Sequence, residues 1–232
     1  MKLELRALPP TVRGIYNTKA GPGTLPERFR YLWPPAADAL LEMELDTGGL
    51  VYSDILRSAE ESLAAMQRKA GVQPPGFSGH NFGFSFDVAV DETMKLRGWD
   101  YNRLLTELEA HGWYGHRRDG ARGYGKSESW HFNYLGSGGG KYLVLARPGA
   151  WAEPLEARVR DVYGAAFALT DSEVQACLKK LGMYAGDVDG VVGPLSKQAI
   201  GAFQRAWRLP EGPADSRTRR VLAFVAAERV IV

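Results

Sequence analysis

The stretch S-G-H-N-F-G-F-S-F-D, residues 78–87, alternates aromatic residues with small or polar ones. The apolar positions of this stretch and its continuation are Phe82, Phe84, Phe86 and Val88. Successive side chains of a β-strand point to opposite faces of the sheet, so this period of two predicts a strand over residues 82–90. One face of the strand is apolar, and the other carries Gly83, Ser85 and Asp87. We therefore expect a strand that covers a core with one face and presents polar groups on the other.

Further elements are predicted around this strand from helix signals and short apolar runs. We expect helices over residues 35–44, 58–69 and 100–111, the last with Asp100 as its N-cap. We expect short strands over residues 50–52, 130–134 and 141–146. The last two strands would form a hairpin across the glycine-rich residues 136–140. Residues 1–34 are rich in Pro and Gly and are predicted to be irregular.

A change to purely helical patterning marks a second domain. Thr170 and Glu173 form a predicted capping box at the start of a helix, and Gly182 ends that helix. Two more helices are predicted, one on either side of Pro210. The predicted fold class is α+β, with a small antiparallel sheet and flanking helices followed by a three-helix bundle. We place the domains at residues 1–148 and 169–232, joined by a linker over residues 149–168.

The composition is that of a soluble globular protein. Of the 232 residues, 45% are hydrophobic and 24% are charged, and the net charge is +2. This small charge gives no reason to expect a nucleic-acid partner. Glu4 and Arg6 interrupt the first apolar residues, so no signal peptide is predicted, and no apolar run approaches the roughly 20 residues of a membrane span. The single cysteine, Cys177, excludes an intrachain disulfide. We expect a monomer.

Four side chains have the chemistry of a catalytic zinc site. Such a site takes three nitrogen or oxygen ligands from the protein and keeps one position open for water. A base that is not a ligand must lie near that water. His80, Asp87 and His131 can supply the ligands, and Glu128, three residues before His131, can supply the base. Gly83 is expected to leave room for the metal.

Each of these residues also has a structural interpretation. A histidine beside aromatic residues is usually hydrogen-bonded within the fold, and an aspartate at the end of a strand usually belongs to a turn. His111 and His116 are competing ligands. We predict His111 to sit at a helix C-terminus, where a cation is favourable, and both histidines to be structural or exposed rather than metal-bound. Ser78, Asn81 and Ser85 are polar neighbours able to orient the ligands.

Two motifs together resemble one enzyme family. The first stretch resembles the S-x-H-x-x-G-x-A-x-D motif of the D-alanyl-D-alanine carboxypeptidase and L-alanyl-D-glutamate endopeptidase family of zinc peptidases. E-S-W-H, residues 128–131, resembles the E-x-x-H motif of the same family. The resemblance spans roughly residues 35–146. It implies that His80, Asp87 and His131 bind zinc and that Glu128 is the catalytic base.

The chain departs from this family at several positions. Ser85 replaces the alanine of the first motif. The family's upstream Ser-x-x-Arg-Ser segment corresponds here to D-I-L-R-S, so that Arg57 aligns while Asp54 replaces the serine. Ser62 stands where a glutamine is usual. The resemblance implies that Arg57 contacts the substrate or its oxyanion, and the structural alternative is a surface ion pair at a helix end.

The C-terminal part resembles a second family. V-Q-A-C-L-K-K-L-G-M-Y-A-G-D-V-D-G, residues 174–190, and A-I-G-A-F-Q, residues 199–204, resemble the three-helix peptidoglycan-binding domain. The resemblance covers about residues 170–226 and implies peptidoglycan as the partner. Val174, Leu178, Leu181, Ile200 and Phe203 are the predicted core of this domain.

Together these features predict a zinc-dependent peptidase that cleaves peptide bonds in bacterial peptidoglycan, as an endolysin-like endopeptidase or a D,D-carboxypeptidase. The alternative is a non-catalytic cell-wall-binding protein with a structural metal site. Without a signal peptide, the protein is expected to be made in the cytoplasm and to reach the wall by phage lysis or by non-classical export.

Overall fold

The computed structural model describes residues 1–15, 23–68, 72–115, 129–136 and 152–232. The chain forms two compact units, neither of them continuous in sequence. The first, called here the sheet unit, comprises Glu4–Arg57, Gly79–Val159 and Val230–Val232. The second, the helical unit, comprises Met1–Leu3, Ser58–Ser78 and Arg160–Arg229. The domain bounds 1–148 and 169–232 stay a prediction. In the structure, residues 58–78 belong to the same compact unit as the C-terminal helices.

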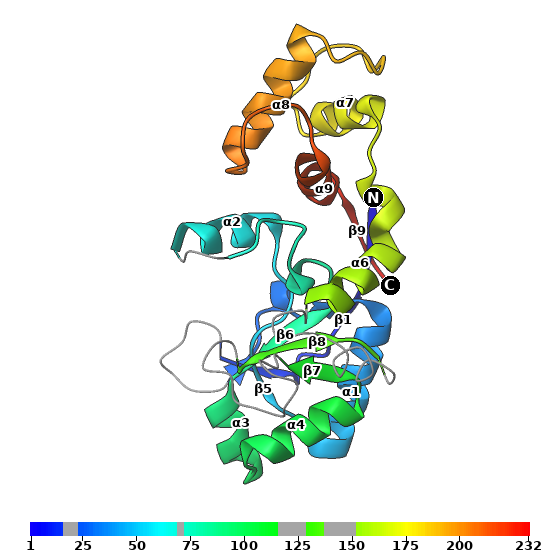
Figure 1. Cartoon of the computed structure of the whole chain (residues 1–232). Helices are drawn as coiled ribbons and strands as arrows, with labels where there is room; N and C mark the ends of the chain where they lie inside the picture. The colour runs from blue at the N-terminus through cyan, green and yellow to red at the C-terminus, as the bar shows by residue number, and fades with distance from the viewer. Residues whose placement is uncertain (16–22, 69–71, 116–128, 137–151) are drawn as a thin grey trace. The chain divides into compact units, whose positions relative to one another are not determined.

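A six-stranded sheet organises the sheet unit (Figure 1). Its strands, in spatial order, are β3 (Gly23–Thr24), β2 (Arg13–Gly14), β5 (Val51–Asp54), β6 (Ser85–Val88), β8 (His131–Tyr134) and β7 (Trp113–Gly115). Neighbouring strands are antiparallel except β2 and β5, which run parallel. The prediction of a purely antiparallel sheet is therefore wrong at this one pair. The structure is of mixed α and β type.

The predicted strand over residues 82–90 is shorter than expected but has the expected faces. Regular pairing covers β6 alone, because Gly83 adopts a left-handed backbone conformation with φ of 71°. Phe82, Phe84, Phe86 and Val88 are nevertheless all buried. β8 lies beside β6 and alternates in the same way, with Phe132 buried and its neighbours His131 and Asn133 on the other face.

The prediction that residues 1–34 are irregular is wrong. They contain β1 (Lys2–Ala7), the 3₁₀ helix η1 (Glu27–Phe29) and β4 (Tyr31–Leu32), as well as β2 and β3. β1 pairs antiparallel with β4, and β9 (Glu228–Ile231) completes a three-stranded sheet of order β4-β1-β9. Leu3 and Leu5 alternate along β1 and are buried, so the period of two was present in the sequence.

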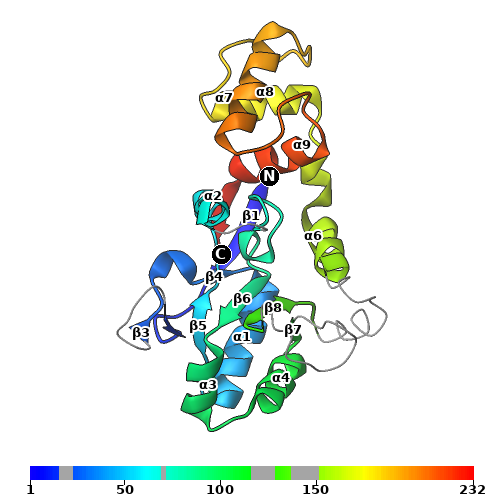
Figure 2. The same cartoon turned by 60° about the vertical axis from the view of Figure 1, so that its left-hand side comes forward.

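Three helices lie together against one face of the large sheet, as Figures 1 and 2 show: α1 (Pro34–Thr47), α3 (Val90–Arg97) and α4 (Tyr101–Ala110). The helices predicted over 35–44 and 100–111 are confirmed as α1 and α4, and Asp100 caps α4 by accepting a hydrogen bond from the backbone N–H of Arg103. α3 was not predicted. The core between helices and sheet includes Leu40, Met43, Leu104, Leu108, Phe86, Val88, Trp113 and Phe132.

The helical unit contains the three predicted C-terminal helices, α7 (Asp171–Lys180), α8 (Pro194–Ala206) and α9 (Ser216–Val225). Both hydrogen bonds of the predicted capping box at Thr170 and Glu173 are present. A buried cluster joins the helices: Val174, Leu178, Tyr184, Ala199, Ile200, Phe203, Leu209, Val221 and Leu222. The predicted helix over 58–69 is α2 (Ala59–Arg68), and the predicted linker contains the helix α6 (Ala152–Phe167). Among the described residues, none of the helices combines the length and apolar character needed to cross a membrane.

Candidate metal centre

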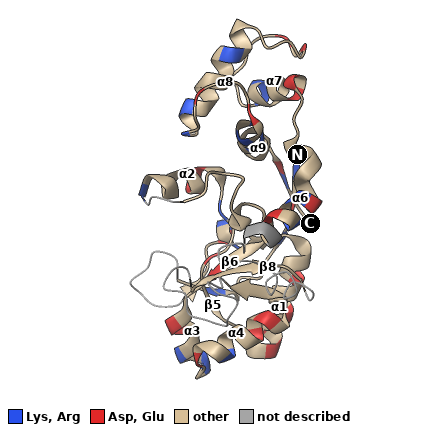
Figure 3. Ribbon diagram, in the orientation of Figure 1, with Lys and Arg blue, Asp and Glu red and all other residues tan. Residues whose placement is uncertain are grey.

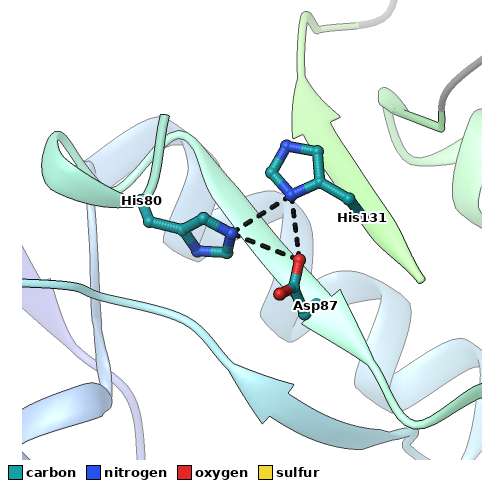
Figure 4. A group of neighbouring side chains, drawn as sticks. All are labelled: His80, Asp87 and His131. Atoms are coloured by element: carbon teal, nitrogen blue, oxygen red, sulfur yellow. Dashed lines mark hydrogen bonds and ion pairs between the residues drawn. The ribbon is translucent and has the colours of Figure 1, made fainter. Parts of the chain in front are cut away.

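Three of the predicted site residues lie together on the polar face of the sheet (Figure 4). His80 belongs to a short 3₁₀ helix, η2 (Gly79–Asn81), which leads the chain into β6. Asp87 lies on β6, and His131 is the first residue of β8. Asp87 and His131 are paired across the two strands, so their side chains leave the same face of the sheet side by side.

Three electron-pair donor atoms, one from each residue, converge at a single point. The distance from His80 Nε2 to Asp87 Oδ1 is 3.2 Å, and that from His80 Nε2 to His131 Nδ1 is 3.1 Å. His131 Nδ1 lies 2.9 Å from Asp87 Oδ1. The side chain of His80 is 2% exposed, while those of Asp87 and His131 are 13% and 12% exposed. The cluster is therefore buried on the His80 side and reaches solvent on the other.

The outer nitrogen of each imidazole is held by a separate acceptor. His80 Nδ1–H donates to the backbone carbonyl of Ile55 at 2.7 Å. His131 Nε2–H donates to Asn133 Oδ1 at 3.1 Å. When both rings are neutral, these hydrogen bonds leave the lone pairs of His80 Nε2 and His131 Nδ1 directed at the cluster. Two lone pairs and a carboxylate oxygen then face one another, an arrangement that a cation stabilises.

The donor set fits a divalent metal ion. Two imidazole nitrogens and one carboxylate oxygen are ligands that zinc accepts, with bonds of about 2.0–2.2 Å. In a tetrahedral site of that bond length, neighbouring ligand atoms are roughly 3.3 Å apart. The separations of 2.9–3.2 Å found here require only a small expansion. His80, Asp87 and His131 could thus hold a metal ion, and three protein ligands leave a fourth tetrahedral position.

The charges within the cluster shift two pKa values in opposite directions. Burial opposes ionisation of Asp87, but the charge of His80 and hydrogen bonds from His131 and His80 hold the pKa of Asp87 far below its ordinary value. Burial likewise opposes protonation of His80, but the charge and hydrogen bond of Asp87 raise the pKa of His80. At pH values below this raised pKa, the metal-free cluster holds a proton on His80 in the place that a metal ion would take.

Gly83 does not leave room for the metal as predicted, and Gly79 leaves room instead for a hydrogen bond that supports His131. A Cβ atom on Gly79 would lie 1.9 Å from Ser85 Oγ, which donates a hydrogen bond to Asn133 Oδ1 at 2.5 Å. A Cβ atom on Gly83 would instead meet the backbone of Leu32 and Trp33, at 2.8 Å from the carbonyl carbon of Leu32. Gly83 is thus needed for the close approach of that backbone, while Gly79 protects the support of His131.

Arg57 lies beside the cluster and is held on several sides. Its Nε donates to Asp54 Oδ2 at 3.1 Å, and Nη2 donates to the same oxygen. The backbone N–H of Arg57 donates to the carbonyl of His80 at 3.0 Å, and the carbonyl of Arg57 accepts from Asn81 Nδ2 at 3.0 Å. This hydrogen bond from Asn81 helps to fix the Arg57 segment. The side chain of Arg57 is 21% exposed, so part of it reaches solvent.

The remaining predicted site residues fall in different places. Glu128, the predicted base, and His116 lie outside the described residues, as do residues 141–146. His111 caps the C-terminus of α4, as predicted, and contacts the carbonyl of Glu107 at 2.8 Å and Asp46 Oδ2 at 3.0 Å. It is not part of the His80 cluster.

The backbone before His131 turns rather than extends. Ser129 and Trp130 form a turn whose carbonyl groups accept hydrogen bonds from Tyr101 Oη at 2.9 Å and from the backbone N–H of Val88 at 2.8 Å.

Two supporting groups were not predicted. Asn133 shares a face with His131 because both lie on β8 two residues apart, and the period of two was a sufficient signal to find it. The carbonyl of Ile55 carries no signal in the sequence, because a backbone acceptor is brought to His80 by the fold alone. Of the three predicted polar neighbours, Ser85 acts through Asn133.

The fold and the cluster define a protein of mixed α and β structure that has a candidate metal centre in one unit and a helical second unit. Residues 172–222 of the helical unit match the family model of a peptidoglycan binding domain. The chain thus carries a peptidoglycan-binding domain, and this associates it with the cell wall. The matched stretch covers α7, α8 and most of α9 and does not include the candidate metal centre. None of the curated proteins matches the chain.

Proposed function

We propose that the protein is a zinc-dependent peptidase that hydrolyses peptide bonds in bacterial peptidoglycan. The observation that carries the proposal is the convergence of His80 Nε2, Asp87 Oδ1 and His131 Nδ1 within hydrogen-bonding distance of one another. The peptidoglycan-binding domain in the same chain supplies the substrate class. The resemblance of residues 78–87 and 128–131 to motifs of zinc peptidases agrees with both.

A catalytic role for the metal explains the exposure of the cluster. Structural zinc sites are closed by four protein ligands, whereas catalytic sites keep one position open. The described residues offer three candidate ligands, and Asp87 and His131 are partly exposed. These features favour the peptidase over the alternative, a non-catalytic wall-binding protein with a structural metal.

A bound zinc ion would supply Lewis acidity, which favours attack by water near neutral pH and polarises the amide carbonyl. In the proposed reaction Glu128 takes the proton of the attacking water and passes it to the leaving amine. Arg57, held in place by Asp54, pairs with the developing oxyanion or with a substrate carboxylate. The outer hydrogen bonds of His80 and His131 keep both rings oriented during the reaction. The peptidoglycan-binding domain keeps the site close to an insoluble substrate.

Two cleavage specificities follow from the same site. An endopeptidase acts within stem peptides or their cross-links, and a D,D-carboxypeptidase removes a terminal residue. The first would suit a phage endolysin released at lysis, and the second would suit a wall-remodelling enzyme exported by a non-classical route.

Mass spectrometry of digested peptidoglycan tests the proposal. Purified sacculi are incubated with the zinc-loaded protein, with the protein plus a chelator, and with His131→Ala as the inactive control. We expect new amine and carboxylate termini in the first sample only, restored to the second by added zinc. The masses of the released fragments identify the bond that is cut. Equal fragment release with and without the chelator would exclude a zinc peptidase.

A further inference from the structure

The helical unit contains a pocket of about 620 Å³ between α8 and the loop that follows it. This volume lies within the range of ligand-binding pockets, roughly 300–1,000 Å³. Its apolar lining comes from Val192, Ile200, Pro213 and Ala214, and Lys197 and Gln198 add polar groups. These residues all lie within the stretch that matches the peptidoglycan-binding domain.

One face of α8 forms a wall of the pocket. Lys197, Gly201 and Gln204 are spaced by four and three residues, which places them on the same side of the helix. Gly201 has no side chain and leaves open space on this side of α8. A Cβ atom there would meet nothing closer than Arg205 Nη1 at 3.4 Å. A larger side chain at this position would therefore extend into the pocket.

The opposite wall is fixed by a buried side chain. Gln204 is 1% exposed; its Oε1 accepts from the backbone N–H of Gly212 at 3.0 Å, and its Nε2 donates to Thr218 Oγ1 at 3.1 Å. These bonds tie the loop over residues 211–214 to α8 and α9. The pocket is thus built before a ligand arrives, which reduces the entropic cost of binding.

The charges around the pocket favour an anionic ligand. Arg205 pairs with Glu211, and Arg219 pairs with Asp171. Lys197 is exposed and, among the residues that the structure describes, has no such carboxylate partner. α8 carries Lys197 and Arg205 and no acidic residue (Figure 3).

We propose that this pocket is the peptidoglycan-binding site of the helical unit and that it takes an anionic muropeptide. Acetamido methyl groups of the glycan would contact the apolar lining, and a free carboxylate of the stem peptide would pair with Lys197. A charge-assisted hydrogen bond of this kind is stronger than a neutral one. The assignment goes beyond the proposed peptidase activity and does not depend on it, because it concerns binding alone.

Binding of the full-length protein to purified sacculi, in the presence of a chelator that prevents hydrolysis, tests this assignment. Gly201→Leu fills the pocket, and Lys197→Glu reverses its charge. We expect each to weaken binding by about tenfold or more, the usual effect of losing one interaction with a charged or fully enclosed group. A soluble muropeptide should displace the parent protein from sacculi, while a neutral N-acetylglucosamine oligomer should not.

Matched controls separate the pocket from general effects. Ala206→Leu adds the same side chain to the same helix outside the pocket, and Arg208→Glu makes the same charge change outside it. Both should bind sacculi as the parent does. Gly201→Leu should not unfold the domain, because leucine favours a helix more than glycine does. Unchanged binding by Gly201→Leu and Lys197→Glu, or no binding by the parent, would overturn the assignment. If His131→Ala loses peptidase activity but still binds sacculi, the result agrees with the pocket as the binding site.

Discussion

Asp54 holds Arg57 through two hydrogen bonds to one carboxylate oxygen, while its other oxygen, Oδ1, is buried and has no hydrogen-bond partner among the described residues. Asp54 also lies opposite Asp87 on the neighbouring strand. An acidic residue thus connects a predicted substrate-binding arginine to the strand that carries a candidate metal ligand. Since a guanidinium held at two points is more rigid than one held at a single point, this pairing should position Arg57.

Replacing Asp54 tests that positioning role. We expect Asp54→Ser to lower kcat/KM for peptidoglycan fragments about tenfold, roughly 1.4 kcal/mol, because Arg57 then has to be ordered by the substrate. Metal content should not change, since Asp54 is outside the candidate ligand set. Steady-state kinetics and elemental analysis measure both quantities. Arg103→Ala is the control: it removes the exposed Arg103, which pairs with the partly buried Glu107 on α4, and should leave the kinetics unchanged. Equal kinetics in the parent and Asp54→Ser would remove Asp54 from the site.

Zinc should stabilise the folded protein. An ion that binds the native state alone contributes about 2.7 kcal/mol when its free concentration is 100 times Kd. We expect calorimetry to show a higher unfolding temperature with zinc than with a chelator. His131→Ala should abolish the difference, and His111→Ala should retain it because His111 is paired with Asp46 instead. A zinc-induced shift of full size in His131→Ala would show that the ion binds elsewhere.

Zinc affinity should increase with pH. A ligating imidazole must be neutral, and Asp87 raises the pKa of His80 above its ordinary 6.5, so zinc has to displace a proton. We expect the apparent affinity to rise about tenfold per pH unit below that raised pKa for each proton released. Isothermal titration calorimetry in buffers of different ionisation enthalpy measures both affinity and proton release. The titrations are carried out at several pH values between about 5.5 and 7.5. An apparent zinc affinity that does not change over this range would contradict a protonated His80 in the metal-free protein.

The stability of the metal-free protein should depend on pH in the opposite sense to zinc affinity, because the contribution of His80 falls as the pH rises. A raised folded pKa means that His80 contributes stability below 6.5 and loses it as the pH rises through the folded value. A lowered folded pKa means that Asp87 contributes stability above 3.8 and loses it as the pH falls further. The cluster's own contribution is therefore greatest between these limits. Chemical unfolding of chelator-treated protein, compared with Asp87→Asn, measures it.

Glu128→Gln should separate binding of the metal from chemistry. The amide is similar in size to the carboxylate but cannot take a proton, so we expect hydrolysis to fall by at least about 100-fold, the usual contribution of a general base. Zinc content and sacculus binding should stay at parent levels. Activity near the parent level would assign the base to another residue, and loss of zinc would make Glu128 a ligand.

Gln175 should be a major stabilising residue of the helical unit. Its side chain is 1% exposed and accepts from the backbone N–H groups of Asp189 and Gly190 at 3.0 and 2.8 Å. It also donates to Asp189 Oδ1 at 2.9 Å. We expect Gln175→Leu to lower the free energy of unfolding by about 2–4 kcal/mol, because two partly buried backbone N–H groups lose their acceptor and the side-chain amide loses its hydrogen bonds. The exposed Gln198→Ala should change it by less than about 0.5 kcal/mol. Circular dichroism during thermal unfolding compares the two.

Local signals explain which parts of the fold could be predicted. Asp100 and Thr170 cap helices through their own side chains, and the alternation from Phe82 to Val88 depends only on neighbouring residues. The parallel pairing of β2 with β5 depends on contacts between residues far apart in sequence, so no local pattern contains it. The two-residue strands at residues 13–14 and 23–24 are too short to show a period.

The same distinction applies to the candidate site. The residue types and spacing of His80, Asp87 and His131 were enough to propose them together, and the structure brings all three within reach of one ion. The role of Gly83 was misjudged because its neighbour, the backbone of Leu32 and Trp33, arrives from another part of the chain. The sequence also could not reveal that Ile55 orients His80 through a carbonyl group.

The candidate ligands are distributed over η2, β6 and β8, and His131 follows His80 by 51 positions in the chain. An unfolded chain therefore holds no preformed set of donors, and the free energy of coordination becomes available only once these strands have paired. If the chain crosses a membrane unfolded, it must acquire its ion after arrival, from the supply outside the cell. If it folds before release, it would take its ion from the cytoplasm, so the supply that determines the bound metal differs between the two routes.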